Sequence, residues 1–400
     1  MGLDIHGVQS QLDALASNLQ SQTAQHHARL QQAIQQLRSA DADAINGKRT
    51  QGRFAWPVPA FPLNPAAHHS PTLPPPDYRA LATDGSRIDI DRHLPVRCAL
   101  LNISKVLLRY GATPDARLDS TPHLYTGDDQ LALTDPDSTR EQLMEGALLG
   151  LKSSVEELAA LAELAEESAD DTATLALVDG SLILWGPTIQ AYPDYVRRAF
   201  IDQGLLPALD RLKAVASRQP LALAAYISLP GSTGVADALR LAVCPYDPVN
   251  CDQHCGRLQA GQRPCDSVGG LLDRELFANT LSPGERSELF TSTSSIVEEY
   301  YGDHAVAFYY LNVGEEMARV EVPAWVAQDE TLLNLSHSLI LDQCRRGLGY
   351  PVAIMEAHEQ AVITGQDREL FRRMVEDALA ERHLPVYTSE KARSKRQRSL

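Results

Sequence analysis

The stretch LALVDGSLILW at residues 175–185 places an aspartate between two apolar runs. Both runs are typical of buried β-strand, where a carboxylate is costly to desolvate unless charge or hydrogen bonds compensate it. A second Asp-Gly-Ser, beginning at Asp84, lies far away in the chain and also adjoins an apolar run. Asp-Gly is also a common turn dipeptide between hairpin strands. Two such aspartates in one chain nevertheless suggest a shared divalent metal, with each glycine as the bend that aims its carboxylate.

The composition is that of a globular protein with a substantial core. The chain has 400 residues, of which 44% are hydrophobic and 22% are charged, enough for one or two domains. The apolar runs are shorter than a membrane span and the N-terminal residues lack a signal-peptide pattern, so we expect a cytoplasmic protein without membrane contact. A formal charge of −16 argues against a protein that coats DNA through a basic surface, but a local metal-filled cleft stays compatible with it.

The pattern of residues divides the chain into four parts. Residues 1–45 carry apolar side chains at 3-4 spacing and predict a helical, coiled-coil-like arm that contacts a second copy, a partner or its own domain. Residues 46–77 are rich in proline and predict an extended linker. A compact body follows at 78–387, with a Cys-rich insertion at 244–265, and residues 388–400 form a basic, flexible tail.

Strand-like and helix-like segments alternate within the body, which predicts a mixed α/β fold. Strands are expected at residues 87–90, 99–108, 173–185, 221–228, 306–313, 317–322 and 352–355. Helices are expected at residues 139–168, 193–217, 331–346 and 367–381. The sequence contains no Walker A loop, Gly-x-Ser-x-Gly elbow or His-Glu-x-x-His helix, which excludes the common ATPase, serine hydrolase and zincin classes.

Three further residues are candidates for the site of the two aspartates. His358 follows a short apolar run, and we expect it at a strand end as a metal ligand or proton shuttle. Tyr350 can orient a phosphate or a water. Glu157 flanks the apolar stripe of the helix at 139–168 closely enough to point inward. Carboxylates suit Mg²⁺ or Mn²⁺, the histidine favours Mn²⁺, and such ions activate water against a phosphodiester.

A separate cluster contains four of the six cysteines, at Cys244, Cys251, Cys255 and Cys265. Four thiols within 22 residues of a cytosolic chain favour metal ligation over disulfides. Their spacing, C-x6-C-x3-C-x9-C, matches no standard zinc finger. Zn²⁺ and an iron–sulfur cluster are therefore both open, with unligated thiols as the alternative.

The order of these motifs resembles the NurA nuclease family. The similar pieces cover about residues 80–375 and are TDGS (83–86), LVDGSL (177–182), YIS (226–228), FYYL (308–311), ARVEVPAW (318–325), GYPV (349–352) and EAH (356–358). The resemblance implies an RNase H-like core, in which helices flank a mixed central sheet. It also implies a Mn²⁺-dependent 5′–3′ DNA exonuclease, with single-strand endonuclease activity as an option. Such an enzyme resects double-strand breaks as a homodimer with a HerA-type hexameric motor ATPase.

The resemblance also assigns roles to individual residues. The family's metal ligands and its C-terminal tyrosine and histidine correspond to Asp84, Asp179, Tyr350 and His358. Its helix glutamate corresponds to Glu157, with Glu163 in reserve, because the surrounding helix offers no fixed anchor. The cysteine cluster and the N-terminal arm lie outside the family's minimal pattern.

Together these observations predict a metal-dependent deoxyribonuclease. Four arginines are expected either to contact the DNA backbone or to form surface salt bridges, namely Arg319, Arg368, Arg372 and Arg373. The alternatives are an RNA-directed nuclease on the same fold and a non-catalytic adaptor that docks a DNA-translocating ATPase. The acidic and histidine positions count against the adaptor, because a docking platform has no need of costly buried carboxylates.

Overall fold

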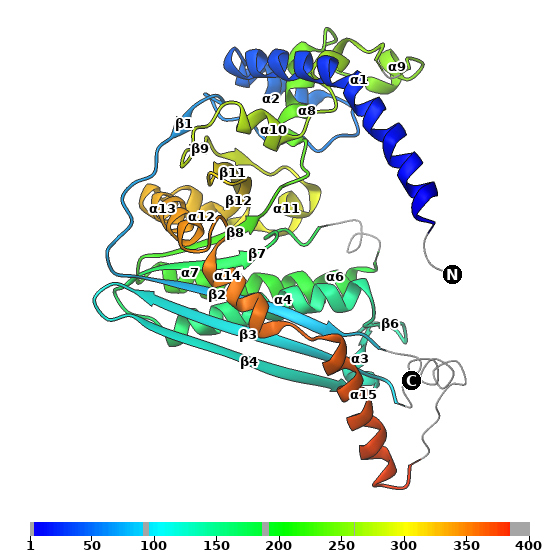
Figure 1. Ribbon diagram of the computed structural model, residues 1–400, viewed down its shortest axis with the longest axis vertical. Coiled ribbons are helices and arrows are strands. Elements are labelled where there is room, and N and C mark those ends of the chain that lie inside the picture. The colour runs from blue at the N-terminus through cyan, green and yellow to red at the C-terminus, as the bar shows by residue number, and fades with distance from the viewer. Residues whose placement is uncertain (1–3, 91–95, 186–191, 260, 385–400) are drawn as a thin grey trace. The chain divides into compact units, whose positions relative to one another are not determined.

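The computed structural model describes residues 4–90, 96–185, 192–259 and 261–384 (Figure 1). The chain forms two compact units. The first unit comprises Met1–Pro71, Ile227–Ser295 and Ala307–Val320. The second unit comprises Thr72–Tyr226, Ile296–Val306 and Glu321–Leu400. The predicted body at 78–387 is therefore not one unit, because a large part of it packs with the N-terminal segment instead.

Five strands of the second unit follow one another in the order β8-β7-β2-β3-β4. They span Tyr78–Ile88 (β2), Cys98–Tyr110 (β3), Asp115–Thr126 (β4), Ala173–Asp179 (β7) and Leu221–Ile227 (β8). β2, β3 and β4 form an antiparallel meander, whereas β7 runs parallel to β2, and β8 parallel to β7. This order, with β3 antiparallel to the other four strands, is that of an RNase H-like core. The predicted fold class is confirmed.

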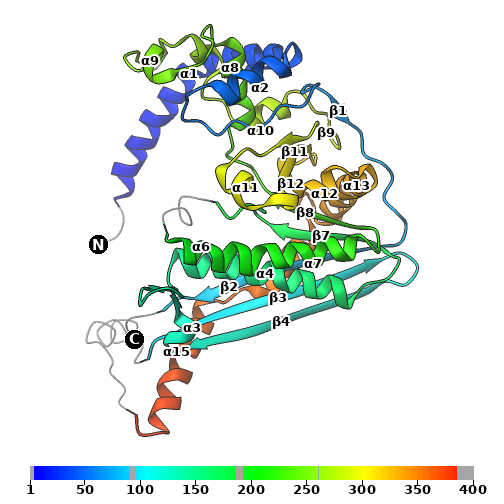
Figure 2. The ribbon, with the colours of Figure 1, turned by 180° about the vertical axis from the view of Figure 1, so that it is seen from behind.

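Helices cover both faces of this sheet. α4 (Ala147–Glu167) and α7 (Leu206–Ala216) lie on one face, and α13 (Glu330–Arg346) and α14 (Val352–Ala361) lie on the other (Figures 1 and 2). A strand between two helical layers has no face in water, which explains why residues 175–177 are apolar without alternation and fully buried. The aspartate that follows them therefore emerges from the centre of the unit.

Shorter elements complete the second unit. They are α3 (Asp128–Leu131), β5 (Ala132–Thr134), β6 (Glu141–Leu143), α6 (Asp194–Phe200), a π-helical turn (Ile201–Leu205), α11 (Ser295–Tyr300), a 3-10 helix (Gly302–His304), α12 (Ala324–Ala327) and α15 (Gly365–Ala380). The predicted helix at 193–217 corresponds to α6, the π-helical turn and α7 in succession. The predicted helix at 139–168 begins later than expected, because its first residues form β6.

The predicted strand at 352–355 is wrong, because these residues form the first turn of α14. Four apolar residues are too few to distinguish a strand from a buried helical turn. The buried residues of this segment recur at helical spacing, as Ala353, Ile354, Ala357 and Ala361. His358 therefore projects from a helix that packs on β2 and β3, and not from a strand end.

The first unit is built around the second half of the N-terminal arm. α1 (Ile5–Arg38) buries Leu30, Ile34 and Leu37 in the core of this unit, whereas Leu12 in its first half is 52% exposed. α2 (Ala42–Gln51) and the buried side chain of Phe61 lie within or beside the predicted linker at 46–77, so part of that segment is packed. The predicted tail at 388–400 lies outside the described residues.

The other elements of the first unit are α8 (Gly234–Val243), α9 (Cys251–Cys255), a 3-10 helix (Pro264–Val268), α10 (Asp273–Ala278) and the strands β1 (His68–His69), β9 (Arg286–Ser287), β10 (Phe290–Thr291) and β11 (Val306–Asn312). β12 (Met317–Pro323) belongs to this unit as far as Val320, and its last residues, from Glu321, belong to the second unit. β11 and β12 are neighbours, as the predicted strand pair at 306–322 requires. Among the helices that the structure describes, none combines the length and the apolarity needed to cross a bilayer.

The two halves of α1 give a direct test of this packing. Leu37→Ala removes a side chain that is 1% exposed, so we expect a loss of about 2–5 kcal/mol in the free energy of unfolding. Leu12→Ala removes an exposed leucine of the same helix and serves as the matched control, with an expected change near zero. Urea denaturation followed by circular dichroism measures both. Equal effects of the two substitutions would contradict the packing.

Candidate functional site

The two aspartates lie on neighbouring parallel strands of the second unit. Thr83 on β2 pairs in register with Val178 on β7, so Asp84 and Asp179 are the next residues on two adjacent strands. Asp84 sits within β2, which continues to Ile88, whereas Asp179 is the last residue of β7. The Ser104 hydroxyl on β3 accepts a hydrogen bond from the Asp84 backbone N–H at 3.1 Å. Both carboxylates thus emerge at the same end of the parallel strands, where α/β folds place their ligands.

The glycines that follow the aspartates have different roles. Gly180 has a φ of +93°, so it bends the chain at the end of β7 as predicted. Gly85 lies in extended strand and is not a bend. A Cβ atom at Gly85 would lie 2.3 Å from Glu157 Oε1 and 2.5 Å from Ser153 Oγ. The missing side chain of Gly85 therefore makes room for α4 to bring its glutamate against β2.

Glu157 is the helix carboxylate that joins the two aspartates. The Ser153 hydroxyl, one helical turn earlier, donates a hydrogen bond to Glu157 Oε1 at 2.8 Å, and the Thr83 hydroxyl donates to the Glu157 backbone carbonyl at 2.8 Å. Burial, together with the negative charges of Asp84 and Asp179, raises the pKa of Glu157 to about 7 against the opposing Ser153 hydrogen bond. The three carboxylates therefore lie within electrostatic reach of one another.

Glu163, the reserve choice, lies elsewhere on the same helix. Its carboxylate forms a salt bridge with Lys105 Nζ at 2.5 Å, and its side chain is 52% exposed. A carboxylate held in this way on the surface of the helix is not part of the acidic cluster. The structure brings Glu157, and not Glu163, to the aspartates.

Tyr350 contacts the second aspartate directly. Its hydroxyl donates a hydrogen bond to Asp179 Oδ1 at 3.1 Å, and its ring packs edge-on against Tyr226, with 5.5 Å between the ring centres. Solvent reaches Asp179, yet the surrounding protein atoms and the charge of Asp84 raise its pKa, while Tyr350 and His358 act in the opposite direction. Tyr350 therefore stabilises and orients a carboxylate that its neighbours repel.

His358 reaches the site from α14 on the opposite face of the sheet. Its Nδ1 atom lies 2.9 Å from Asp84 Oδ2, and its imidazole is 61% exposed. The Ser104 hydroxyl donates to the Ala357 carbonyl at 2.7 Å, and the Asn102 amide donates to the Ala361 carbonyl at 2.9 Å. These hydrogen bonds from β3 fix α14, and with it the position of the histidine.

The donor set fits a divalent cation. The charges of Asp84 and Asp179 raise the pKa of Glu157, and that of Asp84 raises the pKa of Asp179, so negative charge accumulates here. Hard oxygen ligands with one imidazole are those that Mn²⁺ and Mg²⁺ take. In this structure each carboxylate forms a hydrogen bond with another side chain: Glu157 with Ser153, Asp179 with Tyr350, and Asp84 with His358. Within residues 4–90, 96–185, 192–259 and 261–384, no three His, Cys, Asp or Glu side chains converge closely enough to hold one ion. Coordination would therefore exchange these hydrogen bonds for bonds to the metal.

A pocket of about 290 Å³ opens beside the carboxylates, and Glu157, Asp179 and Trp185 are among the residues that line it. The Trp185 indole is 48% exposed, and its N–H donates to the Ser181 hydroxyl at 3.0 Å. Ser181 donates in turn to Glu321, a fully buried carboxylate that also accepts the Leu182 N–H at 3.0 Å. Glu321 thereby fixes the segment that carries Trp185.

Several of these contacts were not predicted from the sequence. The contact of Ser153 with Glu157 could have been predicted from the sequence, because the two residues stand four positions apart, the spacing of one helical turn. Glu321 could also have been recognised as a candidate, because it is the single carboxylate among the buried residues of β12. Arg87, half-exposed on β2, lies near enough to Glu157 to lower its pKa, but a charged residue next to a strand end carries no distinctive pattern.

The predicted phosphate contacts are not brought together. Arg319 is 7% exposed in the first unit, with its guanidinium 3.6 Å from the centre of the Phe308 ring, so its predicted contact with DNA does not hold. Arg368, Arg372 and Arg373 lie on α15. Arg372 pairs with Glu376 at 3.3 Å in a largely covered ion pair, and Arg373 pairs with Glu369 at 3.6 Å on the exposed side of the helix, each over one helical turn.

Comparison with known proteins gives one match of high coverage. The NurA domain matches residues 78–363, which is more than half of the chain. LC9-RNase H1, a type 1 RNase H with the type 2 active-site motif, has 13% identity over 42% of this chain and 71% of its own, with a TM-score of 0.20. The Argonaute of Aquifex aeolicus has 12% identity over 71% of this chain and 28% of its own, with a TM-score of 0.21. TM-scores this low support no conclusion about the fold or the function of this chain. A search of curated proteins found no match.

The raised pKa of Glu157 predicts a pH-dependent stability. The carboxylic acid is favoured in the fold, so its contribution is complete below the unfolded pKa and is lost as pH rises through the folded value of about 7. With EDTA present, the stability of Glu157→Gln relative to the wild type is expected to increase by about 2–3 kcal/mol between roughly pH 5 and 8. Urea denaturation measures it, with exposed Glu163→Gln as the control. A pH-independent difference would show that Glu157 is not held buried next to the aspartates with a raised pKa.

Proposed function

The chain belongs to the NurA family, and from this membership together with its acidic site we propose that it is a metal-dependent deoxyribonuclease. The observation that carries the proposal is the gathering of Asp84, Asp179 and Glu157 at one end of an RNase H-like sheet, with His358 beside them. Carboxylates at such close quarters repel one another, and a divalent cation relieves that repulsion while serving phosphodiester chemistry.

Asp84, Asp179, Glu157 and His358 would hold one or two Mn²⁺ or Mg²⁺ ions. Such ions, when bound, activate water and stabilise the leaving oxygen of a phosphodiester. Ser153 keeps Glu157 turned toward the aspartates, and Tyr350 keeps the Asp179 carboxylate in place. His358 is engaged at Nδ1 by Asp84, so the other nitrogen of its exposed imidazole would serve either as the metal ligand or for proton exchange with substrate or water.

The surroundings of the site suit a nucleic acid strand. Trp185 presents a half-exposed indole on the pocket that Glu157 and Asp179 line, a position where a nucleobase can stack. Arg87 places a half-exposed guanidinium next to the carboxylates, where it can contact a backbone phosphate. The net charge of −16 makes such local contacts, and not a broad basic surface, the means of holding DNA.

Family membership supports finer proposals about the activity. These are 5′–3′ exonuclease action, a role in resecting double-strand breaks, assembly as a homodimer and cooperation with a HerA-type hexameric ATPase. The exposed apolar positions in the first half of α1, among them Leu12, Leu15 and Leu19, are compatible with contact to another chain.

Asp179→Ala tests the site assignment. We expect it to abolish Mn²⁺-stimulated degradation of end-labelled DNA, because it removes a central carboxylate, while circular dichroism stays unchanged since Asp179 is solvent-accessible. Glu163→Ala removes an exposed carboxylate of α4 that pairs with Lys105, away from the aspartates, and should leave the activity intact. The assay includes Mg²⁺ and EDTA arms and an RNA substrate. Full activity of Asp179→Ala would overturn the assignment, and cleavage of RNA alone would overturn the choice of DNA.

Trp185→Ala tests the stacking contact. The loss of one base–aromatic stack costs about 1–3 kcal/mol, so KM for single-stranded DNA should rise roughly 5- to 150-fold with a smaller effect on kcat. Trp185→Phe keeps an aromatic face and should retain most of the affinity. Steady-state kinetics on short labelled oligonucleotides separate the two constants. An unchanged KM in the alanine variant would place the substrate strand away from this side chain.

A further inference from the structure

The cysteine cluster of the first unit lies outside the proposed nuclease site. Its thiols come from three elements: Cys244 follows the last residue of α8, Cys251 and Cys255 begin and end α9, and Cys265 lies in the 3-10 helix after it. All four are free thiols. A long insertion with few regular elements thus presents four potential ligands from neighbouring segments.

The thiols come together around the end of α8. Arg240 of α8 donates a hydrogen bond to Cys265 Sγ at 3.5 Å, and Cys244 follows Arg240 by about one helical turn, just after the last residue of α8. Cys244 and Cys251 both pack against the hydrophobic core of the first unit. The cysteines that are close in the sequence therefore also lie on neighbouring parts of the fold.

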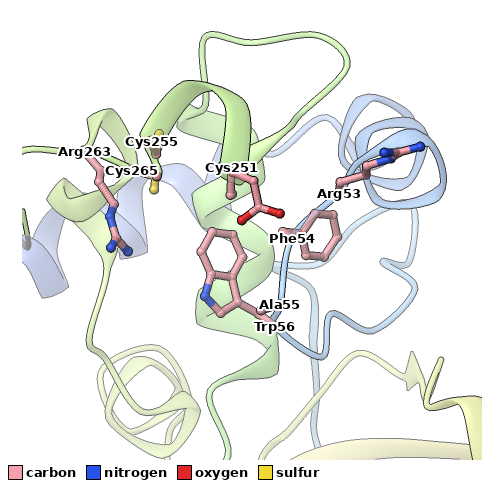
Figure 3. A pocket seen from close by; sticks show the side chains of 10 residues that line it. Arg53, Phe54, Ala55, Trp56, Cys251, Cys255, Arg263 and Cys265 are labelled. Atoms are coloured by element: carbon pink, nitrogen blue, oxygen red, sulfur yellow. The ribbon is translucent and has the colours of Figure 1, made fainter. Parts of the chain in front are cut away.

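Three of the thiols border a single cavity. Cys251, Cys255 and Cys265 line a pocket of about 520 Å³, with Arg53 and Trp56 on its other side (Figure 3). Among the described residues, no three His, Cys, Asp or Glu side chains converge closely enough to hold a single ion, whereas an iron–sulfur cluster keeps its thiolate ligands farther apart than one zinc ion does. The cavity far exceeds the roughly 30 Å³ of one water molecule, so it can accommodate a ligand of several atoms.

The charges around the cavity suit a negatively charged group. Arg53 and Arg263 line it, opposed by the single carboxylate of Asp252. Arg240 donates a hydrogen bond to Cys265 Sγ at 3.5 Å, and its guanidinium lies 3.8 Å from the centre of the Trp56 ring. Hydrogen bonds to cysteine sulfur and nearby positive charge stabilise thiolate-bound clusters and set their potentials.

We propose that Cys244, Cys251, Cys255 and Cys265 bind an iron–sulfur cluster of the four-cysteine type in this cavity. The proposal rests on four free thiols on neighbouring segments, a cavity that three of them line, and cationic side chains at its wall. The cluster would join α8, α9 and the 3-10 helix to residues 53–56, in a unit that contains none of the proposed nuclease residues.

The test measures iron, acid-labile sulfide and zinc in the full chain after anaerobic purification and reconstitution with ferrous iron and sulfide. We expect iron and sulfide in equal amounts and a visible absorption band that dithionite bleaches. Cys255→Ser/Cys265→Ser should lose all three signals. Cys98→Ser/Cys344→Ser changes two buried cysteines outside the cluster and should retain them.

Three results would overturn the proposal. They are stoichiometric zinc without labile sulfide, a wild-type chain that takes up no iron and sulfide, and a Cys255→Ser/Cys265→Ser variant that keeps the full complement. The wild-type measurement does not depend on the folding of any variant. Metal content is also read independently of DNA cleavage, so the outcome does not depend on the nuclease proposal.

Discussion

Mutual repulsion among Asp84, Asp179 and Glu157 is the constraint on which the candidate site depends. The fold forces the two aspartates together, because β2 and β7 are adjacent parallel strands in fixed register. α4 then presses a third carboxylate against β2, and burial together with the two neighbouring charges raises its pKa to about 7. Holding three carboxylates close together lowers the stability of the fold, and a bound cation would offset that loss. This is the reason to regard the site as functional.

The surrounding residues serve to maintain this costly arrangement. Gly85 gives Glu157 the space it occupies, and Ser153 donates a hydrogen bond to the same carboxylate. Tyr350 stabilises Asp179, while His358 contacts Asp84 from the other face of the sheet. These residues come from β2, α4, α14 and the loop before α14, and they surround carboxylates carried by two adjacent strands. All of these residues belong to the second unit, whose sheet and covering helices hold them in place.

The sequence predicted the parts of this arrangement that leave a local pattern. Asp179 was recognisable because apolar residues flank it, whereas Asp84, inside a strand, depended on the family resemblance. The choice of Glu157 over Glu163 followed from the helical face. The sequence placed His358 beside the aspartates, as the structure does, but at a strand end instead of on a helix. The apolar run before it is too short to separate strand from helix. The burial of Arg319 and the packing of residues 227–295 with the N-terminal arm depend on long-range contacts, which no local pattern encodes.

Location of a bound ion is the most direct test of the central claim that the three carboxylates form one divalent-cation site. Crystals of the full chain soaked in Mn²⁺ would be measured at a wavelength where manganese scatters anomalously. The account predicts an anomalous peak within coordination distance of Asp84, Asp179 and Glu157, which disappears in Asp179→Ala. Manganese bound elsewhere in the chain, with no peak among these carboxylates, would contradict it.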